Sequence, residues 1–146
     1  MDDVAVERFI LVVEDNPEHS HQIAHALNES PVSYQIGTIA DGTEALQFLR
    51  RQGSYEAAPR PALILLDLNL PGKDGREILA DIKGDPSLRR IPIVVLSSSG
   101  DEADIFNTYA LHGNCYVIKS WHSDQLFHIV KRIEQFWLGI VTLPVE

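Results

Sequence analysis

Hydrophobic residues gather in five short runs along the chain, separated by longer stretches of mixed polarity. The runs are FILVV (9–13), YQIGTIA (34–40), ALILL (62–66), IPIVVLSS (91–98) and CYVIK (115–119). Short runs that are apolar throughout are typical of strands buried on both faces of a sheet. We therefore predict five strands, with the strand at 34–40 the weakest.

The stretches of mixed polarity have the spacing of amphipathic helices. They lie at 16–30, 41–53, 74–84 and 101–113, and a last one begins near Ser123. Gly53 stands where a cap at the C-terminus of the second helix belongs. The helix at 101–113 is the least regular, so we expect it to be the least stable and the most mobile helix. Strands that alternate with helices predict an α/β fold: a doubly wound, five-stranded parallel sheet with helices on both faces.

Composition narrows the class of protein. The chain has 146 residues, 45% of them hydrophobic, which suits a single domain covering 1–146, with a short apolar extension from about residue 136. A net charge of -9 argues against nonspecific nucleic-acid binding, and the single cysteine excludes an intrachain disulfide. No apolar run approaches a membrane span, and the acidic N-terminus lacks the layout of a signal peptide. We therefore expect a cytoplasmic protein.

Polar side chains follow four of the five predicted strands. In an open α/β sheet with strand order 2-1-3-4-5, the carboxyl ends of these strands meet at one edge, where ligands bind. Asp67 is the most conspicuous of these residues, since it ends an unbroken apolar run; taken alone it could simply start a turn. The residues at this edge are Glu14, Asp15, Asp67, Asn69, Ser97, Ser98, Ser99 and Lys119.

This set of strand ends resembles the receiver domain of two-component response regulators, over about 9–136. The resemblance implies the CheY-like, or flavodoxin-like, version of the fold, and it implies that Asp67 accepts a phosphoryl group. It implies that Asp15, Asp67, the backbone carbonyl of Asn69 and, through water, Glu14 hold Mg²⁺. Lys119 and Ser97 would contact the phosphoryl oxygens, and Tyr116 would be the aromatic switch that turns inward as Ser97 moves.

One position departs from the family pattern. The lysine is commonly followed by a proline in a cis linkage, but Lys119 is followed by Ser120. A cis bond before a residue other than proline costs about 3 kcal/mol. The bond could therefore be trans with a reshaped loop, or cis and strained, which leaves the reach of Lys119 open.

A narrower resemblance connects the chain with the stand-alone response regulators that partner cyanobacterial phytochromes. It rests on the loop GSYEAAPRP, the segments LLDLNLPGKDGREILADIK and NCYVIKS, and the ending FWLGIVTLP. It implies a sensor histidine kinase as partner, a phytochrome. Because fewer than about twenty residues follow the last helix of the receiver pattern, we expect output through protein contacts or a histidine phosphotransfer protein rather than through an effector domain. We expect no direct contact with nucleic acid or membrane.

Two other functions compete with this one. Aspartate-nucleophile phosphohydrolases also use Asp, Lys and Mg²⁺, but their nucleophile follows the first strand, whereas Asp67 follows the third. A receiver fold that only binds partners would not need the complete acid set. We therefore expect a phosphoacceptor switch, with self-catalysed phosphotransfer and autodephosphorylation as its only chemistry.

The chain ends in the apolar stretch FWLGIVTLPV (136–145). An exposed apolar patch usually marks an association surface, so we predict a homodimer formed through the last helix, the last strand and this tail. The expected interface residues are Phe136, Trp137 and Leu138. The alternative is that the tail folds back as additional core.

Overall fold

The computed structural model describes residues 8–29, 34–119 and 123–144 and contains one sheet of five parallel strands. The strand order is β2-β1-β3-β4-β5, as predicted. The bounds of the strands are β1 Arg8–Val13, β2 Tyr34–Ile39, β3 Leu63–Leu66, β4 Ile93–Ser97 and β5 Cys115–Ile118. Each strand lies within one of the five apolar runs or extends beyond it by one residue.

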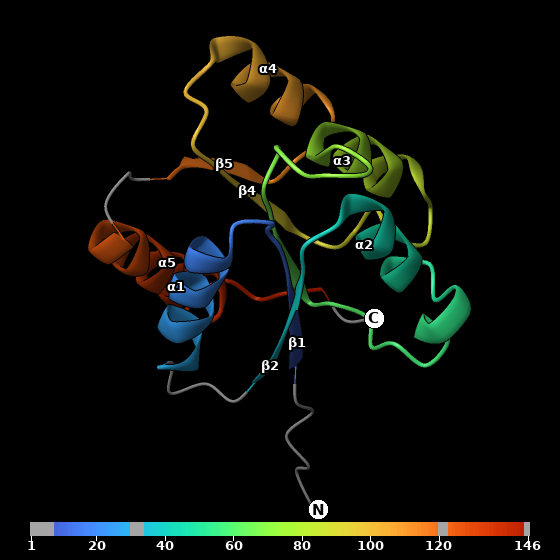
Figure 1. Ribbon diagram of the computed structural model, residues 1–146, viewed down its shortest axis with the longest axis horizontal. Helices are drawn as coiled ribbons and strands as arrows, with labels where there is room; N and C mark the ends of the chain where they lie inside the picture. The colour runs from blue at the N-terminus through green and yellow to red at the C-terminus, as the bar shows by residue number, and fades with distance from the viewer. Residues whose placement is uncertain (1–7, 30–33, 120–122, 145–146) are drawn as a thin grey trace, which may run out of the picture.

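Within the described residues, five α-helices and one short 3-10 helix connect and follow the strands (Figure 1). Their bounds are α1 Pro17–Asn28, α2 Gly42–Leu49, η1 Gly53–Tyr55, α3 Gly75–Gly84, α4 Glu102–Ala110 and α5 Ser123–Trp137. The capping prediction for Gly53 is wrong. Helix α2 ends at Leu49, and Arg51 adopts a left-handed conformation with φ 55° before Gly53 begins the 3-10 helix.

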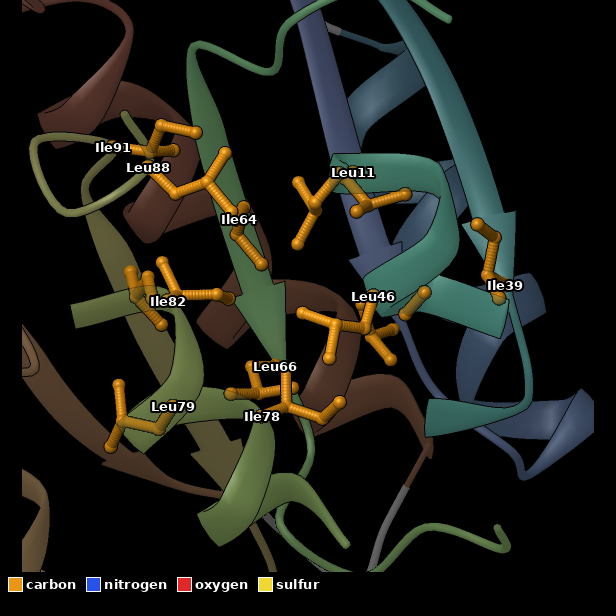
Figure 2. Close-up of a cluster of buried hydrophobic side chains, with 14 of the residues drawn as sticks. Leu11, Ile39, Leu46, Ile64, Leu66, Ile78, Leu79, Ile82, Leu88 and Ile91 are labelled. Carbon is orange, nitrogen blue, oxygen red and sulfur yellow. The ribbon is translucent and has the colours of Figure 1, made fainter. Parts of the chain in front are cut away.

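Alternate residues of the central strands enter two separate cores, one on each face of the sheet. Leu11 and Ile64 pack with helices α2 and α3, in the cluster drawn in Figure 2. Ile10 and Leu63 point the other way and pack with α1 and α5. Because side chains alternate along a strand, a strand with apolar residues on both faces must be covered on both faces. The apolar runs of the sequence are explained in this way.

The apolar tail is divided between the core and the surface. Leu143 is buried, and Trp137 and Leu138 are half-buried against the core formed by α1 and α5. Phe136 and Ile140, in contrast, are 51% and 75% exposed. Part of the tail thus follows the fold-back alternative, while two large apolar side chains remain accessible to a partner.

Candidate functional site

Three carboxylates meet at the carboxyl edge of the sheet, where two central strands end. Glu14 and Asp15 follow β1, and Asp67 follows β3. Strand pairing continues one residue beyond each strand: the Glu14 N–H donates to the Ile39 carbonyl at 3.0 Å, and the Asp67 N–H donates to the Val13 carbonyl at 2.9 Å. Glu14 and Asp67 are buried, whereas Asp15 is exposed. These backbone bonds hold the acids on rigid elements.

The loop after β3 turns back over Asp67 and requires a glycine. A Cβ atom on Gly75 would lie 2.2 Å from the Asp67 carbonyl oxygen and 2.6 Å from the Leu68 Cα, so any larger residue would push the loop away. The Gly75 N–H also donates to the Leu68 carbonyl at 2.9 Å. The close approach of Gly75 therefore helps to fix the backbone at Asp67.

Lys119 brings a positive charge into this acidic site. Its Nζ donates to Glu14 Oε1 at 2.5 Å and lies 3.4 Å from Asp67 Oδ2. The side chain is only 3% exposed, and the Lys119 N–H donates to the Ser97 carbonyl at 2.7 Å. Buried carboxylates need a partner of opposite charge, and Lys119 provides it for two of them. Ser120, and with it the question of its peptide linkage, lies outside the described residues.

The carboxylates have the arrangement and chemistry of a divalent-metal site. One ligand oxygen from each of Glu14, Asp15 and Asp67 can be chosen so that all three lie within 4.8 Å of one another. Carboxylate oxygens are the ligands that hard cations such as Mg²⁺ and Mn²⁺ prefer. Burial raises the pKa of Glu14 to about 7, against the opposing effect of its hydrogen bond with Lys119. Three carboxylates this close together repel one another, and a cation bound between them would relieve this repulsion.

The position of Asn69 is compatible with its predicted role but does not test it. Asn69 is exposed, and its N–H donates to Asp67 Oδ1 at 3.3 Å. The loop residue therefore lies beside the acid at the site. A metal contact through its carbonyl remains a prediction.

Ser97 and Tyr116 are linked through the loop after β4. Ser97 is fully buried, and its Oγ accepts from the Ser99 N–H at 3.2 Å. The Tyr116 hydroxyl donates to the Ser99 carbonyl at 2.7 Å, and the Tyr116 N–H donates to the Tyr109 hydroxyl at 3.1 Å. Movement of Ser97 would therefore disturb the segment that holds Tyr116. The structure brings the two predicted switch residues into one chain of hydrogen bonds.

An ion pair between α3 and α4 is connected to this series of hydrogen bonds through Ser99. No pattern in the sequence indicated the ion pair. Arg76 donates from Nε and Nη2 to the two carboxylate oxygens of Asp104, each at 2.8 Å. The Ser99 hydroxyl also donates to Asp104, at 2.8 Å. The hydrogen bond from the Arg76 guanidinium lowers the pKa of Asp104, and the hydrogen bond from Ser99 lowers it further. No local motif marks two residues that lie on different helices.

His19 is the second functional candidate that the sequence did not indicate. It lies in the first turn of α1, and its Nδ1 is 3.2 Å from Lys119 Nζ. The only available signal was that α1 starts directly after the acid pair, so its first turn must lie near the site. His21 and His25, which have the spacing of a helical metal site, are exposed, and His25 pairs with Glu29 instead. They remain best explained as a solvated helix face.

Comparison with known proteins gives a consistent result. The response regulator receiver domain family matches residues 10–131. The response regulator Rcp1 of Synechocystis sp. is 50% identical over 137 residues, which are 94% of this chain and 93% of Rcp1.

Two solved structures are similar over nearly the whole chain. The crystal structure of the phosphorylated cyanobacterial phytochrome response regulator RcpA has a TM-score of 0.93 and 55% identity, covering 96% of this chain and 100% of that chain. The Mn²⁺-bound form of Rcp1 has a TM-score of 0.93 and 50% identity, covering 94% of this chain and 99% of that one. The family match covers residues 10–131, and the sequence and structural similarity to these relatives covers nearly the whole chain.

Proposed function

The chain belongs to the response regulator receiver family, and from that membership we propose that it accepts a phosphoryl group on Asp67 from a histidine kinase. The observation that carries the proposal is the contact of buried Lys119 with both Glu14 and Asp67 beside exposed Asp15. Such a cluster can hold a cation and an incoming phosphoryl group together. The similarity to RcpA, whose structure is of a phosphorylated form, supports the same chemistry.

The transfer step uses one carboxylate oxygen of Asp67 as nucleophile. This oxygen forms a bond to phosphorus while the P–N bond of the donor phosphohistidine breaks, and the imidazole nitrogen keeps the electron pair. With an acyl phosphate as donor, the P–O bond breaks and a carboxylate leaves. Charge on the phosphoryl oxygens would be stabilised by the Lys119 ammonium, which lies 3.4 Å from Asp67, and by the Ser97 hydroxyl once Ser97 moves toward the phosphoryl group. Neither group needs to gain or lose a proton.

We propose Mg²⁺ as the metal, held by Asp15, Asp67 and the carbonyl of Asn69, with Glu14 acting through water. The bound cation would neutralise the acids and the transferred phosphoryl oxygens. The carboxylate set does not distinguish Mg²⁺ from Mn²⁺, which occupies the similar protein Rcp1. Mg²⁺ is proposed because it usually keeps several waters and is bound through one or two carboxylates together with phosphate oxygens.

The proposed kinase is a phytochrome, because RcpA is a phytochrome response regulator and is 55% identical to this chain. We propose that the output is a change in protein contacts, with a histidine phosphotransfer protein as one candidate recipient and without direct binding to nucleic acid. No helix among the described segments is long and apolar enough to cross a membrane. A cytoplasmic location agrees with a kinase partner of this kind.

The experiment that tests this function is incubation with acetyl phosphate and Mg²⁺, followed by intact mass measurement. We expect the mass of one phosphoryl group to be added, and chelation of divalent metal with EDTA to prevent it. Continuous hydrolysis of a small phosphate ester by the same sample would favour the phosphohydrolase alternative. Absence of any adduct in Mg²⁺ would favour the binding-module alternative.

Phosphorylation should loosen or shift α4 through the hydrogen bonds around Ser99. This helix buries only Thr108, so few contacts resist its movement. We predict that beryllofluoride with Mg²⁺ changes amide exchange in α4 and in 98–101, while α2, which packs in the core with α3, serves as an internal control. Unchanged exchange in α4 upon saturation with beryllofluoride would contradict this route of coupling.

The exposed part of the tail is the proposed centre of a homodimer. Truncation would also remove buried Leu143, so substitution is the cleaner test. We predict that replacing Phe136 and Ile140 together by Ser lowers the mass measured by light scattering from dimer to monomer. Phe106→Ser is the matched control, since Phe106 is 72% exposed on α4. A monomeric wild-type protein at high micromolar concentration, or a control that dissociates instead, would show that the interface is misplaced.

A further inference from the structure

His19 is held rigidly beside the lysine of the site. Asn16 caps helix α1, and its Oδ1 accepts from the N–H groups of Glu18 at 3.0 Å and His19 at 3.1 Å. This cap fixes the backbone of His19 in the first turn. From there the imidazole reaches Lys119 Nζ at 3.2 Å, across one hundred residues of sequence. The side chain is half-buried.

The chemistry of Lys119 decides how this contact is made. A charged ammonium has three N–H donors and no acceptor, so the His19 Nδ1 must accept and its proton must lie on Nε2. Glu14 Oε1, Asp67 Oδ2 and His19 Nδ1 then offer one acceptor for each donor of Lys119. Burial lowers the pKa of His19, and the charge of Lys119 lowers it further. Both effects favour the neutral imidazole, which can act as this acceptor.

A third acceptor limits the positions that the Lys119 ammonium can take. A long, flexible lysine side chain loses much rotational freedom when its ammonium is fixed. The backbone of Lys119 is held by its N–H bond to the Ser97 carbonyl, and the contact with His19 restrains the Nζ end of the side chain as well.

We propose that His19 is a positioning residue that directs the Lys119 ammonium toward Asp67, so that it meets the phosphoryl oxygen during transfer. The inference rests on the proposed phosphorylation of Asp67 and adds to it a residue on a different element. The carboxylates alone would pull Lys119 toward Glu14, which is the nearer of its two acids at 2.5 Å against 3.4 Å. His19 gives the ammonium a third, neutral partner and so a defined direction.

Two substitutions at His19 separate positioning from packing. His19→Leu removes the acceptor while keeping a side chain of similar size. His19→Asn places an amide oxygen close to the position of Nδ1 and keeps the acceptor. His21→Leu is the matched control, since His21 lies in the same helix and its ring lies near that of His25, at 6.4 Å between centroids.

The rate of modification by acetyl phosphate in Mg²⁺ is measured for each variant over a range of donor concentrations. We expect His19→Leu to reduce the maximal rate about tenfold, which corresponds to ~1.4 kcal/mol. His19→Asn and His21→Leu should stay within about twofold of the wild type, since a factor of two is well under 1 kcal/mol. A His19→Leu rate equal to that of the wild type, or a His19→Asn rate as low as that of His19→Leu, would overturn the proposal.

Nitrogen NMR of the unphosphorylated protein supplies an independent readout. We expect His19 to be neutral with its proton on Nε2, and we expect Lys119→Met to change the Nδ1 chemical shift. A proton on Nδ1 in the wild type would overturn the proposed contact. If the wild type took up no phosphoryl group at all, the function proposed above would fail, while the NMR result would still decide whether His19 binds Lys119.

Discussion

Asp67→Asn should abolish modification by acetyl phosphate, while the protein remains folded. The amide cannot act as the nucleophile, and among the described residues no other carboxylate at the site is placed like Asp67. Glu14 is buried against Lys119, and Asp15 lies at the exposed side of the site. Asp67 is held between the Val13 carbonyl and the loop at Gly75, so its replacement leaves that point without a nucleophile. Intact mass measurement in Mg²⁺ should therefore show no adduct.

Asp85→Asn is the matched control for this experiment. Asp85 is the C-terminal cap of helix α3, and its carboxylate accepts from the Ser87 hydroxyl at 2.7 Å, in a different part of the molecule. This variant should be modified to the same extent as the wild type. Equal adducts on Asp67→Asn and on the wild type would mean that another residue is the acceptor, and that the role assigned to Asp67 is wrong.

Most of the fold could be predicted because the signals are local and repeated. Each central strand is apolar on both faces, and this pattern has few explanations other than a sheet covered by helices on both sides. Helix α4 lies where its weak pattern predicts it. The end of the second helix was predicted wrongly at Gly53, because Arg51 adopts the left-handed conformation that Gly usually supplies. Such an exception cannot be seen in the sequence.

The site could be predicted as far as strand order determines it. Residues at the carboxyl ends of β1, β3, β4 and β5 must meet, and Glu14, Asp67, Ser97 and Lys119 are indeed buried there. Helix residues that reach the site depend on rotation about the helix axis and on side-chain direction. His19 and the pairing of Arg76 with Asp104 therefore emerged only in three dimensions.

The tail shows a limit of a different kind. A run of apolar residues predicts burial, but it does not specify whether the covering surface is the chain itself or a partner. Leu143 is covered by its own domain, while Phe136 and Ile140 are not. Phe136 is an exposed residue of α5, whereas Ile140 and Leu143 follow the end of this helix at Trp137.

Lys119→Met should lower stability sharply, and the loss should increase with pH. The substitution leaves Glu14 and Asp67 buried without their cation, and breaking a buried pair in this way costs about 3–5 kcal/mol. Glu14 can reduce the cost by taking up a proton, since burial already raises its pKa from 4.5 to about 7 in the wild type, and loss of Lys119 raises it further. In Lys119→Met, His19 would also hold a proton more readily, because the Lys119 charge that lowers its pKa is gone.

The direction of the pH effect follows from linkage. The pKa of Glu14 is higher in the folded than in the unfolded state, so its protonation favours folding below about pH 4.5, and this contribution is lost as pH rises through about 7. In Lys119→Met no cation offsets the loss. Urea unfolding in EDTA should therefore show a modest deficit against the wild type at about pH 5 and a much larger one at about pH 8.

Two further variants make this prediction specific. Glu14→Gln combined with Lys119→Met removes one of the unpaired charges, so it should recover part of the stability lost at the higher pH but none of the phosphorylation. Lys83→Met is the matched control, because Lys83 donates to neutral oxygens, the Arg89 and Ile91 carbonyls at 2.9 Å each and Asn114 Oδ1 at 3.2 Å. Its deficit should be nearly the same at both pH values. A Lys119→Met deficit that is equally independent of pH would show that Lys119 contributes packing rather than charge to the site.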